Sequence, residues 1–326
     1  MKRRSILGLT AVALAVPSSL LAQQQGRTYR IGNAWIADSA TTRPYEESFL
    51  AGLRELGFER GRNLIFDVRN CDGDQSRLPA LVDELITLKP DLLAGIEQVA
   101  RVMRSKTSTI PIVLTVSSDP VAAGLAKSLA RPGGNVTGMA ALTEMMAAKQ
   151  VEMLSEILPR MKTVAVLLDP GVPAAGNIEQ HVRAAAQARR AGVVTYFARD
   201  RAALDQAFVE MERNRPDAVV ASAGSGMFFG NRRLIAETAL RLRLPLSGVS
   251  AAQAEAGNLF AYGASLHAMI RRSASYAARI LRGANPSELP IEQAATFELV
   301  INLKTAKALG LTIPPLVLLR ADRVIE

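Results

Sequence analysis

The feature that most constrains the fold is a regular alternation of two kinds of segment along the chain. Short apolar runs bounded by turn residues have the length of buried strands, and the longer segments between them have helical spacing. The predicted strands of the first half are 29–32, 64–68, 91–94 and 110–115, and the predicted helices are 45–56, 77–88 and 98–106. Strands separated by such helices predict βαβ units and a parallel sheet.

The same alternation starts again in the second half. The predicted strands there are 163–168, 193–197, 218–221 and 244–247, and the predicted helices are 174–191, 201–213 and 234–242. Segment 89–94 resembles 215–220, and segment 110–113 resembles 244–247, in the same order. In 89–94 and 215–220 a proline ends a helix just before a strand begins. Together these echoes predict an α/β fold of two lobes with like topology.

The first 22 residues have the order of an export signal. Lys2, Arg3 and Arg4 precede an apolar run at 6–15, and the segment ends at the small residue Ala22. The run is too short for a permanent membrane anchor, and RRSIL at 3–7 also resembles a twin-arginine signal. We therefore expect a cleavable signal peptide over 1–22 and a periplasmic protein. The alternative is a cytosolic N-terminal helix.

Composition argues against several classes of partner. The net charge is +9, but the basic residues gather no further than adjacent pairs and aromatic residues are few, so we expect no nucleic-acid partner. A single cysteine and two histidines exclude an intrachain disulfide and favour no metal site. No GxxxxGK[ST] or GxGxxG pattern is present, and we expect no cofactor.

Several long motifs resemble one protein family. They are SDPVAAGL at 118–125, LARPGGNVTG at 129–138, NLFAYG at 258–263 and FELVINLKTAKALGL at 297–311. These stretches resemble the exported substrate-binding components of ABC transporters, within a largely uncharacterised family of which some members bind aromatic amino acids. The resemblance covers nearly the whole chain after the signal.

The resemblance implies a type I periplasmic-binding-protein fold of two doubly wound parallel-sheet lobes, which hold a small ligand between them and close by a hinge. It implies three crossings between the lobes, near Ala140, near Tyr262 and Gly263, and near Thr296. Lobe I is then expected over 28–140 and 263–295, and lobe II over 141–262 and 296–326. It further implies a monomer whose partners are an ABC permease and its ATPase, with membrane contact only through the permease.

Candidate ligand-binding residues lie in the turns after the predicted strands, because ligands of open α/β sheets bind beyond the carboxyl ends of the strands. We expect Trp35, Asp38, Ser39, Glu97, Gln98, Ser117, Ser118, Asp119, Asp169, Ser225, Ser250 and Tyr262 to contact the ligand. No residue is expected to be catalytic or to bind a metal.

The turn at 117–120 is the predicted anion site. Ser118 or Asp119 is expected to cap a short alanine-rich helix that starts at Pro120. The free backbone N–H groups of such a helix attract a ligand carboxylate, with a hydroxyl from Ser117 or Ser118. Glu97 conflicts with this role, because a carboxylate would repel a ligand carboxylate and favour a cation or a hydrogen-bond donor.

Three candidates have an equally reasonable structural interpretation. Asp169 either pairs with a ligand ammonium group or caps the next helix. Trp35 either forms a wall of an apolar site or fills the core. Tyr262 lies at a predicted crossing and either contacts the ligand or packs at the hinge.

The leading functional hypothesis is a non-catalytic solute receptor for an amino acid or a related small molecule. A ligand-sensing protein for a signalling partner is the main alternative. A hydrolase on the same fold is a further alternative, although Gly224-Ser225-Gly226 lacks the GxSxG spacing of a nucleophile elbow and no motif places either histidine as a base.

Overall fold

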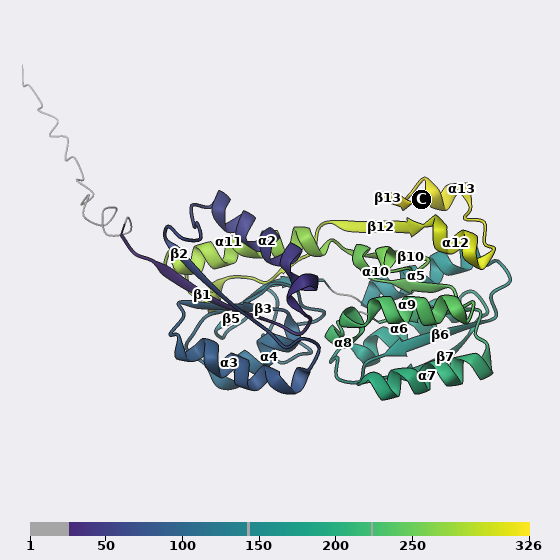
Figure 1. Cartoon of the computed structure of the whole chain (residues 1–326), viewed down its shortest axis with the longest axis horizontal. Coiled ribbons are helices and arrows are strands. Elements are labelled where there is room, and N and C mark those ends of the chain that lie inside the picture. The colour runs from purple at the N-terminus through teal and green to yellow at the C-terminus, as the bar shows by residue number, and fades with distance from the viewer. Residues whose placement is uncertain (1–25, 142–143, 223) are drawn as a thin grey trace, which may run out of the picture.

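The structure is a computed structural model, and it describes residues 26–141, 144–222 and 224–326. The predicted signal peptide at 1–22 lies outside the described residues. Two α/β lobes lie side by side, each built around its own sheet (Figure 1). Both sheets are formed mainly by parallel strands, which confirms the fold class predicted from the sequence.

Lobe I is a six-stranded sheet of order β11-β5-β4-β3-β1-β2 with helices on both faces. Helices α2 and α11 pack together on one face, and α3 and α4 cover the other. The elements of lobe I are β1 (Tyr29–Trp35), α2 (Ser39–Glu55), β2 (Leu64–Asn70), a 3-10 turn (Gln75–Arg77), α3 (Leu78–Thr87), β3 (Leu92–Gly95), α4 (Glu97–Lys106), β4 (Ile112–Leu114), β5 (Val136–Ala140), α11 (Leu266–Leu281), a 3-10 turn (Pro286–Glu288) and β11 (Glu292–Gln293).

Lobe II is a seven-stranded sheet of order β13-β12-β10-β9-β8-β6-β7, in which only the β10–β12 pair is antiparallel among the described strands. Its elements are α5 (Glu144–Ile157), β6 (Thr163–Leu168), α6 (Ala175–Gln187), β7 (Gly192–Phe197), α7 (Arg201–Asn214), β8 (Ala218–Ala221), α8 (Gly226–Gly230), α9 (Arg232–Arg241), β9 (Leu246–Gly248), α10 (Ala251–Glu255), β10 (Phe260–Ala264), β12 (Phe297–Asn302), α12 (Leu303–Leu309), α13 (Pro315–Leu318) and β13 (Arg323–Ile325).

The two lobes share one strand order, because β2-β1-β3-β4-β5 corresponds to β7-β6-β8-β9-β10. The repeated Pro-Asp pair has the same role in both. Asp91 Oδ2 accepts the Arg30 N–H at 2.8 Å, and the Asp91 N–H donates to the Arg30 carbonyl. Asp217 Oδ2 accepts the Thr163 N–H at 2.8 Å, and the Asp217 N–H donates to the Thr163 carbonyl. Each aspartate therefore joins the start of one strand to the start of its neighbour.

The chain passes between the sheets three times. It leaves lobe I between β5 and α5, returns between β10 and α11, and leaves again between β11 and β12 (Figure 1). These passages lie close to the crossings expected at Ala140, Tyr262–Gly263 and Thr296. We propose the predicted lobe boundaries, 28–140 with 263–295 and 141–262 with 296–326, as the domain division, except that residues 263 and 264 complete β10 and stay with lobe II.

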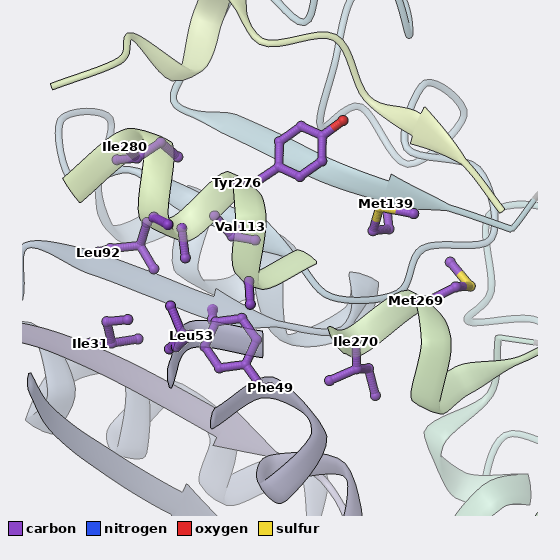
Figure 2. Packing of buried hydrophobic residues seen from close by; sticks show 14 of the residues in the cluster. Ile31, Phe49, Leu53, Leu92, Val113, Met139, Met269, Ile270, Tyr276 and Ile280 are labelled. Atoms are coloured by element: carbon purple, nitrogen blue, oxygen red, sulfur yellow. The ribbon is translucent and has the colours of Figure 1, made fainter. Parts of the chain in front are cut away.

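The returning helix α11 is anchored by a tight contact with α2. Phe49 and Leu53 of α2 and Ile270 of α11 are buried in one cluster (Figure 2). Gly52 permits the close approach, since a Cβ there would lie 2.5 Å from the Arg271 carbonyl oxygen. Burying side chains of this size stabilises a fold by about 1.5–3 kcal/mol each. The pairing therefore holds the second crossing firmly on lobe I.

One predicted element is absent. The alanine-rich segment after Pro120 forms successive turns and no helix. Asp119 Oδ1 accepts the N–H groups of Val121 and Ala122 as a helix cap would, but Gly124 follows in the left-handed region at φ 69° and ends the turn. The predicted helix at this position is therefore wrong.

Within the residues that the structure describes, no helix is both long and apolar enough to cross a lipid bilayer.

Candidate functional site

A cavity of about 130 Å³ lies where the two lobes meet. Its wall combines residues after the carboxyl ends of β1, β3 and β4 in lobe I with residues after β8 and β9 in lobe II, and two residues of α11 complete it. The lining residues are Trp35, Ile36, Ala37, Thr42, Tyr45, Ile96, Glu97, Gln98, Val116, Ser118, Ser222, Gly224, Ser225, Gly226, Phe228, Phe229, Val249, Ser250, Gln253, Leu266 and Ile270. This is the position at which open α/β sheets bind ligands.

Direct contacts join the lobes at the rim of this cavity. Gln98 Oε1 accepts a hydrogen bond from the Gly226 N–H at 3.0 Å. The rings of Tyr45 and Phe229 meet edge to face with centroids 5.9 Å apart. Figure 1 shows α8, which carries Gly226 and Phe229, at the side of lobe II that faces lobe I. The cleft is therefore closed in this structure.

The backbone of lobe II approaches lobe I too closely for side chains. A Cβ on Gly226 would lie 2.7 Å from both Gln98 Oε1 and Ile36 Cδ1. A Cβ on Gly224 would lie 2.3 Å from Ser118 Oγ, and Gly224 has a φ of 83° that favours glycine. Glycine at these two positions makes the close approach of the lobes possible.

The predicted anion site is occupied by a side chain of the protein itself. Glu97 Oε2 accepts hydrogen bonds from Ser117 Oγ at 2.6 Å, the Ser118 N–H at 2.8 Å and the Asp119 N–H at 3.1 Å. Glu97 is only 4% exposed, and it lines the cavity. The backbone donors expected to hold a ligand carboxylate are thus satisfied by Glu97.

The environment of Glu97 disfavours its charged form. Burial raises the pKa of the Glu97 carboxyl above its ordinary value, because desolvation outweighs the three hydrogen bonds and the more distant charge of Arg101. Among the described residues nothing donates to its second oxygen, Oε1. Since Glu97 lines the cavity, Oε1 is the atom available to a ligand.

A second buried carboxylate lies behind the wall of lobe II. Asp169 Oδ2 accepts a hydrogen bond from Ser225 Oγ at 2.6 Å, and Oδ1 accepts the Gly171 N–H at 2.8 Å. Ser225 Oγ in turn accepts the Phe228 N–H as the cap of α8. Asp169 does not line the cavity, so its observed contacts fix Ser225 and the start of α8.

Aromatic rings form much of the cavity wall. Trp35 ends β1 and lies 6.4 Å from Tyr45, measured between ring centroids. Tyr45 also stacks on His267 at 4.6 Å. Burial raises the pKa of the Tyr45 hydroxyl, which keeps it neutral. Phe228 and Phe229 of α8 complete this apolar part of the wall.

Two polar atoms at the cavity have no partner among the described residues. They are Trp35 Nε1 and Ser222 Oγ, and both residues line the cavity. Buried polar groups in proteins are normally hydrogen-bonded. These two atoms are therefore exceptions to that rule within the cavity wall.

The predicted site residues fall into three groups: those that line the cavity, those that support its wall and those that point elsewhere. Six of them line the cavity: Trp35, Glu97, Gln98, Ser118, Ser225 and Ser250. Three support the wall from behind through hydrogen bonds: Ser117, Asp119 and Asp169.

Three predicted residues point elsewhere. Asp38 caps α2 by accepting the Thr41 N–H, which lowers the Asp38 carboxyl pKa, and the adjacent Ser39 is exposed. Tyr262 stacks on Phe297 across the antiparallel β10–β12 pair. None of these three residues lines the cavity. Tyr262 packs against a neighbouring strand, which is the structural alternative to a ligand contact.

Sequence reasoning missed the contribution of α2 and α11. Thr42 and Tyr45 lie on one face of α2, three residues apart, and Ile270 lies on α11. Helical spacing predicted a helix over 45–56, within the region of α2, but a helix pattern alone does not indicate which residues face a cleft. Gln253 was also missed, and it holds the turn after β9 by accepting the Val249 and Ser250 N–H groups.

The described residues assemble no group of three or more potential metal ligands. The histidines are engaged elsewhere, since His267 Nδ1 bonds Ser48 Oγ and His181 Nδ1 bonds the Asn177 carbonyl. Ser225 bonds Asp169 instead of a histidine. The arrangement thus offers binding groups, and no described histidine lies beside Ser225 to complete a hydrolase triad.

Two like-folded lobes that enclose a cavity between the ends of their strands define a cleft-type binding protein. The chain belongs to the family described as ABC transporter substrate binding protein, whose model matches residues 38–325. This confirms the resemblance found in the sequence. Proteins of this family are substrate-binding proteins and not enzymes; they bind small molecules, interact with ABC permeases and, for importers, are exported.

Individual relatives agree with this assignment. A tyrosine-binding protein of Clostridioides difficile is 22% identical over 86% of this chain and 81% of its own. A conserved domain protein of Vibrio cholerae is 29% identical with a TM-score of 0.85, over 91% of this chain and 100% of that chain. An ABC domain of Streptococcus pneumoniae in complex with L-Trp is 25% identical with a TM-score of 0.84, at the same coverages.

Proposed function

We propose that this protein is the exported solute-binding component of an ABC importer. It captures a small molecule, an amino acid or a related compound, in the cleft between its lobes and delivers it to a membrane permease that works with an ATPase. The observation that carries this proposal is the cavity lined by residues of both lobes.

We expect the two lobes to close on the ligand, because each lobe supplies part of the cavity wall. Glu97, Gln98 and Trp35 come from lobe I, whereas Ser225 and Ser250 come from lobe II. The complete set of contacts exists only when the lobes meet, so a ligand that uses both sides shifts the protein toward the closed form. The permease then distinguishes the loaded, closed protein from the open one.

The proposed role of each site residue follows from its position in or behind the cavity wall. Trp35 forms an apolar wall, Glu97 and Gln98 present acceptors from α4, and Ser118, Ser225 and Ser250 supply hydroxyl groups. Ser117, Asp119 and Asp169 position these groups. Relatives described as tyrosine-binding or in complex with L-Trp support an amino-acid-related ligand. We further propose a periplasmic monomer produced by cleavage of the signal at 1–22.

A thermal-shift screen of protein purified from the periplasm tests this function. Amino acids, their amides and amines, and small carboxylates are added singly. A solute that binds only the folded protein stabilises it by about 2.7 kcal/mol at 100 times its Kd, so at least one compound is expected to raise the Tm in a concentration-dependent way. Failure of every solute, together with turnover of an ester or phosphate substrate, would refute the receptor function.

A further inference from the structure

The ligand class can be narrowed beyond the proposed function, on which this inference rests. The backbone donors at Ser118 and Asp119 form the most obvious place for a ligand carboxylate in lobe I. Glu97 Oε2 already accepts both of them and the Ser117 hydroxyl. A ligand carboxylate would have to displace a buried side chain that is held by three hydrogen bonds.

The charges around the cavity also disfavour a ligand carboxylate. Glu97 is the only charged residue among the described lining residues, and the lining contains no lysine or arginine. Arg101 lies one turn further along α4, but its guanidinium bonds the Gly171 carbonyl and does not line the cavity. Asp169 adds a second carboxylate behind Ser225. A ligand carboxylate would therefore meet like charge and no fixed counter-charge.

The free acceptor and the aromatic wall favour a different chemical group. Glu97 Oε1 lacks a donor among the described residues, so it is suited to a ligand N–H. Trp35, Tyr45 and Phe229 line the same cavity as Glu97, and aromatic faces attract ligand cations. The cavity of about 130 Å³ is close in size to an engineered cavity of roughly 150 Å³ that binds benzene.

We infer that the cleft binds a ring-sized compound that carries an N–H donor group, an amine or an amide, and no carboxylate. Glu97 Oε1 accepts the ligand N–H, and the aromatic wall holds the ring. In this protein the Glu97 side chain already accepts the Ser118 and Asp119 N–H groups, which would otherwise suit a ligand carboxylate.

Calorimetric titration with matched ligands tests this inference. Phenylalanine, phenylalaninamide and phenethylamine share a ring and an amine, and only phenylalanine has a carboxylate. The amide or the amine is expected to bind at least tenfold more tightly than phenylalanine. Equal or tighter binding of phenylalanine overturns the inference but leaves the proposed receptor function intact. Absence of binding by both carboxylate-free compounds also overturns it.

Two substitutions at Glu97 test the mechanism of selection. Glu97→Gln is expected to weaken amine binding at least tenfold. Glu97→Ser frees the backbone donors and is expected to increase affinity for phenylalanine. Glu47→Gln removes an exposed carboxylate of α2 and is the matched control. Unchanged selectivity in folded Glu97 variants contradicts the inference, and the wild-type ligand series decides it if these variants do not fold.

Discussion

The side-chain oxygen Oε1 of Gln98 accepts the backbone N–H of Gly226 at 3.0 Å, and this bond joins the first turn of α4 to the first turn of α8. The two residues belong to different lobes. Their contact therefore connects the geometry of the cleft with its closure, and it gives a direct way to alter the closed state without touching either core.

Gln98→Ala removes the acceptor of this inter-lobe bond. A hydrogen bond contributes about 0.5–1.5 kcal/mol net, which corresponds to roughly 2- to 12-fold in an equilibrium constant. The closed population and the ligand affinity are expected to fall by this factor while the unliganded Tm is unchanged. Fluorescence energy transfer between dyes on the two lobes, titrated with phenethylamine or phenylalanine, measures the shift. If the titration curve of Gln98→Ala matches that of the wild type, this bond does not contribute to closure of the lobes.

Gly226→Ala places a Cβ at a point where lobe I approaches closely. It would lie 2.7 Å from Gln98 Oε1 and Ile36 Cδ1 in the closed form. Both neighbours belong to lobe I, so separation of the lobes is expected to remove these contacts. Overpacking costs about 1–3 kcal/mol, so closure is expected to weaken about 5- to 150-fold without loss of Tm. Gly176→Ala on α6, with open space around the new Cβ, is the control. Equal affinities for the two variants would argue against closure at this contact.

Asp169→Ala distinguishes a supporting residue from a ligand contact. The substitution leaves the buried Ser225 hydroxyl and the Gly171 N–H without their acceptor. An unmade bond of this kind costs about 1–3 kcal/mol. Denaturant unfolding is expected to show that loss, and Asp169→Asn is expected to lose less. If Asp169→Asn keeps full stability but abolishes binding, Asp169 is instead a direct partner of the ligand.

Glu97→Gln is expected to change how stability depends on pH. Burial raises the Glu97 pKa above its ordinary value of 4.5 in the folded protein. The folded state therefore binds the proton more strongly than the unfolded state, and the associated stability is present below pH 4.5 and lost as pH rises through the raised pKa. The Tm of the variant minus that of the wild type should increase upward from pH 4.5. A difference that is flat with pH, or that falls as pH rises, would contradict the assignment.

Much of the fold followed from local patterns because each is decided by a few neighbouring residues. The Pro-Asp turns at Asp91 and Asp217 marked equivalent strand starts, and the structure shows the same pair of bonds at both. The helix predicted after Pro120 was wrong. The alanines of this segment favour a helix, whereas Gly124 adopts a left-handed conformation after a single turn. Single-residue backbone geometry of this kind leaves little trace in apolar spacing.

The candidate site was predicted less completely. Residues directly after strands, such as Trp35 and Ser225, were found because strand ends converge at one edge of a sheet. Tyr45 was missed, since its role depends on how α2 packs on α11 and on how lobe II meets lobe I. The carboxylate of Glu97 was recognised as incompatible with a ligand carboxylate. Its capture of the Ser118 and Asp119 N–H groups required three-dimensional geometry.

Small-angle X-ray scattering is the most direct test of the central claim that two lobes close on a small molecule. Scattering from the wild-type protein is compared with that from Gly226→Ala, each with and without saturating phenethylamine, phenylalaninamide or phenylalanine. A smaller radius of gyration is expected for the wild type with at least one compound, and a weaker decrease is expected for Gly226→Ala. Identical wild-type profiles with every compound, despite binding detected by calorimetry, would contradict it.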